Sequence, residues 1–334
     1  MERSSLLGKG AGSSEHPDGG KPSNHTILPL TLGYVLCSSG MMVVNKWALQ
    51  EFPFPSCLMA LQFFTSAVTV RGLGLCGQLD CDPLEASRVR AFLLVPLVFG
   101  VAIYSNIKLL QAASVETAIV FRTLVPILTS LLDFVYMGRE LPSAQSSVGL
   151  VAVVLGAAAY ALSSRDGIRV ATRAWAVLYV GVLAFEMVYV KHVLSSVPMS
   201  TWTRVYYNNG LALFFMPAFI LVGHEYAEVG RAAALLQGSS RAATAVGLSC
   251  LAGIGISFTG FGLRSLITAT TFTVIGVMNK LLTVLLSLML LRRDEPASPF
   301  AILALLACIA GGTLYRQAPI RAAATAATEL AAVA

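Results

Sequence analysis

Two runs of polar residues stand inside apolar stretches of this sequence and could bind a ligand. The first is Tyr206-Tyr207-Asn208-Asn209, whose paired side-chain amides offer four donor hydrogens and two acceptor oxygens. Lipid cannot satisfy these groups in a membrane helix. Hydrogen bonds to neighbouring helices are one explanation. The other is recognition of a planar polar ligand, because an amide can pair with the ring carbonyl and N–H groups of a nucleobase edge.

The second run puts an aromatic ring, a glycine, an amide and an ammonium on one helical face. Phe272, Gly276, Asn279 and Lys280 stand at i, i+4, i+7 and i+8, a spacing that brings side chains to the same side of an α-helix. The glycine leaves the backbone open to close approach. We therefore expect this face to contact a ligand.

Charged residues inside the apolar segments are mostly basic. An unpaired lysine or arginine at mid-bilayer costs about 3 kcal/mol even on the lenient insertion scale, so each needs a partner, a water-filled cavity or a route to the surface. Lysines near helix ends can reach the surface with their long side chains. The embedded residues are Lys46, Lys108, Arg122, Lys191, Arg204 and Lys280 against Glu116, Asp133 and Glu186.

No residue pattern in the sequence points to catalysis or to a metal. The embedded carboxylates have neither the paired spacing of an acid and base nor the spacing of metal ligands. The six cysteines show no CxxC or Cys/His spacing and mostly lie in apolar runs. We expect no catalytic residue, no metal and no cofactor, and the protein is predicted not to be an enzyme.

The composition places these residues in a membrane. Of the 334 residues, 56% are hydrophobic and only 12% are charged, whereas a soluble protein has about 25% charged residues. The mean hydropathy is +0.74. Soluble enzymes and nucleic-acid-binding proteins are thereby excluded. The apolar runs predict ten spans, at about 27–48, 54–77, 91–110, 115–137, 143–163, 174–192, 199–223, 243–264, 269–291 and 298–316.

The two halves of the chain repeat each other. Met42 and Lys46 recur 145 residues later as Met187 and Lys191, and further along the chain Gly100 and Glu140 recur as Gly253 and Glu295. Because each half has an odd number of spans, the second half must be inverted relative to the first. The predicted fold is therefore an all-α membrane protein of ten transmembrane helices, arranged as two inverted five-helix repeats.

The predicted organisation has a transporter domain between two tails. The tail 1–26 is polar and disordered, the domain 27–316 contains repeats at about 27–163 and 174–316, and an Ala-rich tail covers 317–334. Ten spans put both termini on one side. Ten basic residues near the membrane on that side, against seven opposite, favour cytosolic termini, so the sequon at Asn24 should stay unglycosylated.

Small residues mark a helix-packing seam. The stretch Gly156-Ala157-Ala158-Ala159 and its repeat mate Gly311-Gly312 allow close approach of two helices. Both segments are almost free of embedded charge, so a seam fits them better than a ligand wall. The seam lies either within one chain or between two chains of a homodimer.

By its two polar motifs and its ten apolar runs, the chain resembles the nucleotide-sugar transporters of the drug/metabolite transporter superfamily, in the GDP-mannose transporter-like branch. The resemblance covers about residues 27–316. The diagnostic motifs of that branch, Phe-Tyr-Asn-Asn and Gly-Ala-Leu-Asn-Lys, are found here as residues 206–209 and as Gly276-Val277-Met278-Asn279-Lys280. The stretches 115–122 and 186–192 look most like plant and algal members.

The resemblance also implies roles for individual residues. The motif at 206–209 would read the nucleobase, with Asn208 and Asn209 facing guanine. The face of the second motif would contact sugar and phosphate. Two further positions, Ser257 and Arg122, match positions that line the pocket in relatives. The binding residues implied in this way are Tyr206, Tyr207, Asn208, Asn209, Phe272, Gly276, Asn279, Lys280, Ser257 and Arg122.

By this resemblance the protein moves a GDP-sugar of the GDP-mannose, GDP-fucose or GDP-galactose class into the Golgi lumen in exchange for GMP, by alternating access. Its ligands would be GDP-sugar and GMP, in a Golgi membrane, with no nucleic acid partner. The resemblance also allows a homodimer. The alternative is a related antiporter for UDP-sugars or for phosphorylated metabolites such as triose phosphate, although those transporters lack the two motifs. The excess of embedded basic residues suits an anionic diphosphate in either case.

Overall fold

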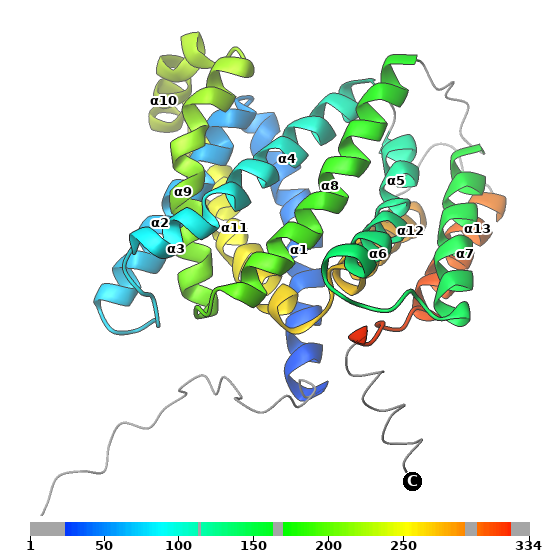
Figure 1. The fold of residues 1–334 in the computed structure, drawn as a ribbon. Helices are drawn as coiled ribbons and strands as arrows, with labels where there is room; N and C mark the ends of the chain where they lie inside the picture. The colour runs from blue at the N-terminus through cyan, green and yellow to red at the C-terminus, as the bar shows by residue number, and fades with distance from the viewer. Residues whose placement is uncertain (1–23, 113–114, 163–169, 291–298, 322–334) are drawn as a thin grey trace, which may run out of the picture.

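The computed structural model describes residues 24–112, 115–162, 170–290 and 299–321, and this part of the chain is helical (Figure 1). A single isolated bridge joins Arg139 and Ile320 within the described residues. The helices, in chain order, are α1 (Asn24–Glu51), α2 (Pro55–Leu75), α3 (Ala86–Phe92), α4 (Leu94–Ala112), α5 (Val115–Thr123), α6 (Val125–Tyr136), α7 (Ala144–Leu162), α8 (Val170–Ser196), α9 (Thr201–Val222), η1 (Tyr226–Glu228), α10 (Val229–Gly238), α11 (Ser240–Leu266), α12 (Ala269–Leu290) and α13 (Pro299–Thr313).

The apolar runs of the sequence correspond to these helices. Among the described residues, seven helical stretches are long and apolar enough to cross a membrane, and three apolar stretches are shorter. The predicted span 115–137 is divided at Leu124, because Pro126 in the first turn of α6 lacks a backbone N–H to continue the helix from α5. The protein is therefore an all-α, multi-pass membrane protein. The expected tails lie largely outside the described residues.

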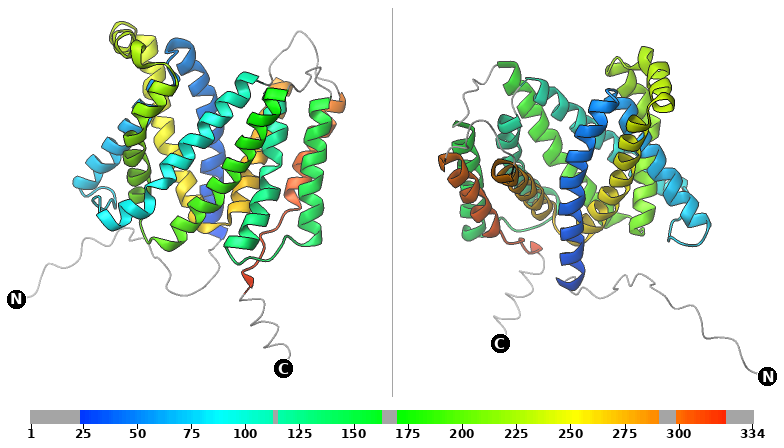
Figure 2. Two further views of the ribbon diagram at one scale, coloured as in Figure 1. Left: turned by 45° about the horizontal axis from the view of Figure 1, so that its top comes forward. Right: turned by 180° about the vertical axis from the view of Figure 1, so that it is seen from behind.

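Helices from the first half of the chain pack against helices from the second half. Helix α1 lies along α11, and α4 lies along α8. Helix α2 packs on α9, α6 on α12 and α7 on α13. Helix α1 begins, and the segment after α13 runs, at one end of the bundle, which we call the terminal end; η1 and α10 lie at the opposite end (Figure 2). Helix α10 was not predicted from the sequence.

The seam of small residues lies between α7 and α13 of the same chain. A Cβ atom on Gly149 would lie 2.5 Å from the carbonyl oxygen of Gly311. A Cβ atom on Gly156 would lie 2.7 Å from Sγ of Cys308 and 2.9 Å from the carbonyl oxygen of Ala304. The two helices can approach this closely only because both positions are glycine. Of the two alternatives left open by the sequence, the structure shows packing within one chain.

Lys191 does not reach the membrane surface as its position near a helix end suggested. Its side chain is buried, and Nζ donates hydrogen bonds of 2.9 Å each to the carbonyl oxygens of Arg264 and Ser265. The last carbonyl groups of a helix have no partner within that helix. Lys191 on α8 therefore caps the end of α11 and joins two helices. The side chains of Lys46, Lys108 and Glu116 lie outside the described residues.

Candidate functional site

Arg122 on α5 lies close to two tyrosines from other helices. Its Nη1 donates a 2.9 Å hydrogen bond to the hydroxyl of Tyr179 on α8. Arg122 also interacts electrostatically with the hydroxyl of Tyr34 on α1 and with Glu186 on α8. Lys280 on α12 lies within electrostatic range of Arg122. Helices α1, α5, α8 and α12 thus meet around two cationic side chains.

A second arginine joins this group from the end of α11. Nη1 of Arg264 lies 2.8 Å from Oε1 of Glu186, and the arginine side chain is 14% exposed while the glutamate is fully buried. The guanidinium also lies over the ring of Phe272, 4.5 Å from its centroid, in a cation–π contact. We call this set the cationic cluster; it comprises Arg122, Arg264, Lys280, Glu186, Tyr34 and Tyr179.

The predicted ligand face of α12 contacts this cluster through α1. The rings of Phe272 and Tyr34 are 4.8 Å apart between centroids. A Cβ atom on Gly276 would lie 3.6 Å from the Tyr34 hydroxyl, so the glycine brings the backbone of α12 close to that oxygen. One turn further, Oδ1 of Asn279 accepts a 2.8 Å hydrogen bond from Ser39 on α1. Its Nδ2 is buried and has no hydrogen-bond partner among the described residues.

The other motif lies on α9, where its two asparagines are buried. Ser200 caps this helix by accepting a hydrogen bond from the backbone N–H of Thr203. Nδ2 of Asn209 donates a 2.7 Å hydrogen bond to the hydroxyl of Ser66 on α2. The Oδ1 atoms of Asn208 and Asn209 are both buried without a partner in the described part of the chain. We call Asn208 and Asn209 the amide pair; the structure gives it two unused acceptors.

The tyrosines of this motif have different surroundings. The hydroxyl of Tyr207 donates to the carbonyl oxygen of Pro83 and accepts from the backbone N–H of Glu85, at 2.8 Å each. Tyr207 is fully buried and thereby fixes the segment between α2 and α3. A contact of its hydroxyl with a ligand would require these bonds to break. Tyr206 is only half-buried, and Arg71 lies over its ring, 5.8 Å from the centroid.

Helix α11 links the two groups of residues. Phe258 and Phe261 pack with Tyr206 and Tyr207 of α9 in one apolar cluster, whereas Arg264 at the end of the same helix belongs to the cationic cluster. Ser257 lies half-buried on α11. The two motifs are thus presented by α9 and α12, with α11 in contact with both.

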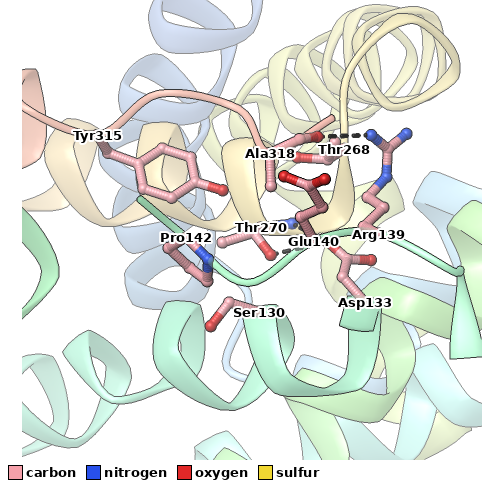
Figure 3. A pocket seen from close by; sticks show the side chains of 9 residues that line it. All are labelled: Ser130, Asp133, Arg139, Glu140, Pro142, Thr268, Thr270, Tyr315 and Ala318. Atoms are coloured by element: carbon pink, nitrogen blue, oxygen red, sulfur yellow. Dashed lines mark hydrogen bonds between the residues drawn. The ribbon is translucent and has the colours of Figure 1, made fainter. Parts of the chain in front are cut away.

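Asp133 has its own partners and does not pair with Arg122. Its Oδ2 accepts hydrogen bonds from the backbone N–H and the hydroxyl of Thr270, at 3.2 and 2.7 Å. Figure 3 shows it beside a small cavity at the terminal end, where the Tyr315 ring and the Ser130 hydroxyl also lie. The cavity volume is about 10 Å³, which is room for about one water molecule. It is too small for the ligands considered above.

Four residues of the cationic cluster, Tyr34, Tyr179, Glu186 and Arg264, were not predicted as site residues from the sequence. Tyr34 and Tyr179 are separated by 145 residues, the offset that relates Met42 to Met187, so the repeat could have pointed to them. Arg264 was counted among the charges outside the spans. Glu186 was counted as embedded, but no partner was assigned to it.

Comparison with known proteins identifies the family. The chain is 38% identical over 295 residues to GDP-fucose transporter 1 of Arabidopsis thaliana, covering 87% of this chain and 86% of that protein. It is 35% identical over 301 residues to the GDP-mannose transporter GONST3 of the same plant, covering 89% and 79% of the two proteins. The chain belongs to the nucleotide-sugar transporter family.

Some GDP-sugar transporters share less sequence with this chain. The GDP-mannose transporter of Scheffersomyces stipitis is 23% identical over 266 residues. Among the solved structures that share this fold is a protein that matches with a TM-score of 0.63 at 14% identity, over 87% of this chain and 97% of its own. No family model matches the chain. The two motifs that carried the resemblance, residues 206–209 and 276–280, lie on α9 and α12 of this nucleotide-sugar transporter.

Proposed function

We propose that this protein transports a GDP-sugar across a Golgi membrane in exchange for GMP. The observation that carries the proposal is the cationic cluster, which brings Arg122, Arg264 and Lys280 together around Glu186 inside a membrane protein. Such a group binds an anion strongly because the surroundings have a low dielectric constant. The diphosphate of a nucleotide sugar carries two negative charges and fits this group. The matched relatives are transporters of GDP-sugars, which favours transport over catalysis.

The amide pair supports guanine as the base. Two unused acceptor oxygens, on Asn208 and Asn209, require donors from a ligand. Guanine offers adjacent N–H donors on one edge, namely its ring N–H and its exocyclic amino group. Uracil offers one ring N–H between two carbonyl acceptors. A UDP-sugar would therefore leave an asparagine oxygen unpaired, which favours a GDP-sugar over that alternative.

The helix pairs support two inverted repeats and alternating access. Exchanging α1 with α8 and α4 with α11 turns the contact of α1 with α11 into that of α8 with α4, and both contacts are present. Under the same exchange of halves, the contacts of α2 with α9 and of α7 with α13 map onto themselves. We infer ten spans in two five-helix repeats, with both termini cytosolic. Because the site residues are largely buried, ligand entry requires the halves to separate.

The exchange of GDP-sugar for GMP follows from the charge of the cluster in this proposal. Its cationic side chains repel one another when the halves enclose an empty cluster, and a bound anion relieves the repulsion. The two ligands carry similar charge, so their exchange moves little net charge across the membrane. Uniport of a dianion would instead work with or against the membrane potential at about 2.3 kcal/mol per charge per 100 mV.

Two substitutions test the assignment of the motifs. Asn208→Ala should remove discrimination between GDP-sugars and UDP-sugars, because one acceptor for the base is lost. Lys280→Ala should weaken transport of every nucleotide sugar, because the charge acts on the shared diphosphate. Uptake of labelled GDP-mannose and UDP-sugars into liposomes containing each variant measures both effects. Wild-type transport and selectivity in both variants would contradict the assignment.

A further inference from the structure

Asn279 on α12 is held by a serine from the first half of the chain. Its Oδ1 accepts a 2.8 Å hydrogen bond from Oγ of Ser39 on α1. The hydroxyl oxygen of Thr283 lies 3.2 Å from that of Ser39. This contact is longer, so the amide oxygen is the better acceptor for the Ser39 hydrogen. The hydrogen of Thr283 itself goes to the backbone carbonyl oxygen of Asn279, at 2.8 Å. The orientation of the Asn279 amide is therefore set by Ser39.

This hydrogen bond leaves the other end of the amide without a partner. Nδ2 of Asn279 is buried and has no hydrogen-bond partner in the described part of the chain. The whole residue is only 3% exposed, so water does not reach the group freely. A buried donor without an acceptor is unfavourable. We therefore expect a ligand to supply the acceptor.

We propose that Ser39 is a positioning residue, which turns the Asn279 amide so that its NH2 group faces the ligand and donates to a phosphate oxygen. The inference deepens the proposed function and rests on it, because it names the part of the GDP-sugar that this face of α12 binds. Ser39 acts through Asn279 and does not need to touch the ligand.

The chemistry of the amide favours a phosphate over a sugar as its partner. The NH2 group only donates, and the oxygens of a nucleotide diphosphate only accept. A sugar hydroxyl also carries a hydrogen that needs an acceptor, and Oδ1 of Asn279 is already engaged by Ser39. The same face of α12 adjoins a guanidinium group, because Arg264 lies over the ring of Phe272. The anionic part of a ligand is therefore expected beside this face.

The amide pair on α9 has the opposite arrangement. There the held group is Nδ2 of Asn209, which donates to Ser66 on α2, and the atoms without a partner are acceptor oxygens. In both motifs a serine from the first half of the chain fixes an amide of the second half. One motif thereby presents acceptors and the other presents a donor. A guanine nucleotide matches both, with N–H donors on its base and acceptor oxygens on its phosphates.

The test measures how much the phosphates contribute to binding. Labelled GDP-mannose bound to the purified protein in detergent is displaced by GDP or by guanosine. These two compounds share base and ribose, so the ratio of their inhibition constants reports the phosphates alone. Ser39→Ala frees the amide to rotate and should lower the advantage of GDP over guanosine about fivefold. Ser39→Cys keeps only a weak donor and should fall between Ser39→Ala and the wild type.

Two further variants are matched controls. Ser39→Thr keeps the hydroxyl and should keep the wild-type ratio. Thr31→Ala removes another hydroxyl from α1, one that donates to the carbonyl oxygen of Ile27 in its own helix, and should also keep the ratio. The ratio does not depend on how much of a preparation is folded, so a lower yield of any variant leaves the comparison intact.

A double-mutant cycle separates positioning from packing. Asn279→Ala should weaken GDP binding about tenfold, because a hydrogen bond to a charged oxygen is lost. Adding Ser39→Ala to Asn279→Ala should change nothing more, since no amide is left to orient. A residue that only supports the packing of α1 on α12 would cost the same in both backgrounds. The cycle needs only the GDP constants, so it holds even where guanosine binds too weakly to measure.

The results distinguish the inference from the function on which it rests. An unchanged GDP constant in Ser39→Ala, an equal loss for guanosine and GDP, or a further loss in the Asn279→Ala background overturns the role of Ser39. Weaker binding of GDP-mannose with unchanged binding of GDP overturns the phosphate as the partner of Asn279. Absence of binding of any GDP-sugar by the wild-type protein overturns the proposed function itself.

Discussion

Replacing Ser66 with alanine tests how the amide pair is oriented for a base. In the structure Nδ2 of Asn209 donates to the Ser66 hydroxyl, which leaves the oxygen of the same amide as the group available to a ligand. Without that hydroxyl the amide has no anchor and can rotate. We expect Ser66→Ala to weaken recognition of the exocyclic amino group of guanine, which needs an acceptor.

The magnitude follows from the burial of the bond. The two atoms are 2.7 Å apart, and Ser66 and Asn209 are each only 1% exposed. Leaving a buried donor unpaired costs about 1–3 kcal/mol, so the variant should lose about 2 kcal/mol of stability. Loss of one well-placed acceptor for the base should also weaken the binding free energy of the ligand by about 1 kcal/mol, which is about fivefold in affinity.

The assay is the competition of GMP and inosine monophosphate for labelled GDP-mannose uptake. Inosine monophosphate lacks only the exocyclic amino group, so the ratio of the two inhibition constants reports its recognition. The ratio should favour GMP in the wild type and fall about fivefold in Ser66→Ala. Ser105→Ala is the matched control, because Ser105 is equally buried but donates to Ala102 in its own helix. A wild-type ratio in Ser66→Ala refutes the reasoning.

Three further predictions concern the fold. Gly149→Ala should lower the free energy of unfolding by about 1–3 kcal/mol, because the new methyl group pushes α7 away from α13. Gly247→Ala places nothing within 4 Å of the new atom and should not destabilise the protein. Thermal unfolding in detergent compares the two variants. Lys191→Met should lower the unfolding temperature, since it removes a charged cap from two carbonyl groups at the end of α11. A thiol reagent should label exposed Cys76 faster than Cys81, because burial raises the pKa of the Cys81 thiol and leaves less of it as thiolate at pH 7 to 8. The difference between the two labelling rates should shrink as the pH rises. Equal rates at pH 7 would contradict this prediction.

The helices could be predicted from sequence because lipid imposes their length and apolar character. The seventh predicted span, for example, covered residues 199–223, and α9 runs from Thr201 to Val222. The division between α5 and α6 was less visible, although Pro126 was its cause. Helix α10 was missed because it is short and lies outside the apolar runs on which the prediction was based. Periodicity therefore located the long spans but not the interruptions and the surface helix.

The site could be predicted only along single helices. The spacing of Phe272, Gly276 and Asn279 placed them on one face of α12, and in the structure all three contact α1. The partners come from elsewhere in the chain: Arg264 meets Glu186 across 78 positions of sequence. No local sequence pattern predicts such a contact, because the contact depends on how α8 and α11 pack.

The most direct test of the proposed function is the uptake of labelled GDP-sugars by purified protein in liposomes loaded with GMP. GDP-mannose, GDP-fucose and GDP-galactose are compared with UDP-sugars, and GMP-loaded liposomes are compared with empty ones. The account predicts that at least one GDP-sugar enters, that internal GMP accelerates its entry, and that UDP-sugars do not enter. Equal uptake with and without internal GMP would contradict the exchange, and uptake of UDP-sugars in place of GDP-sugars would contradict the central claim.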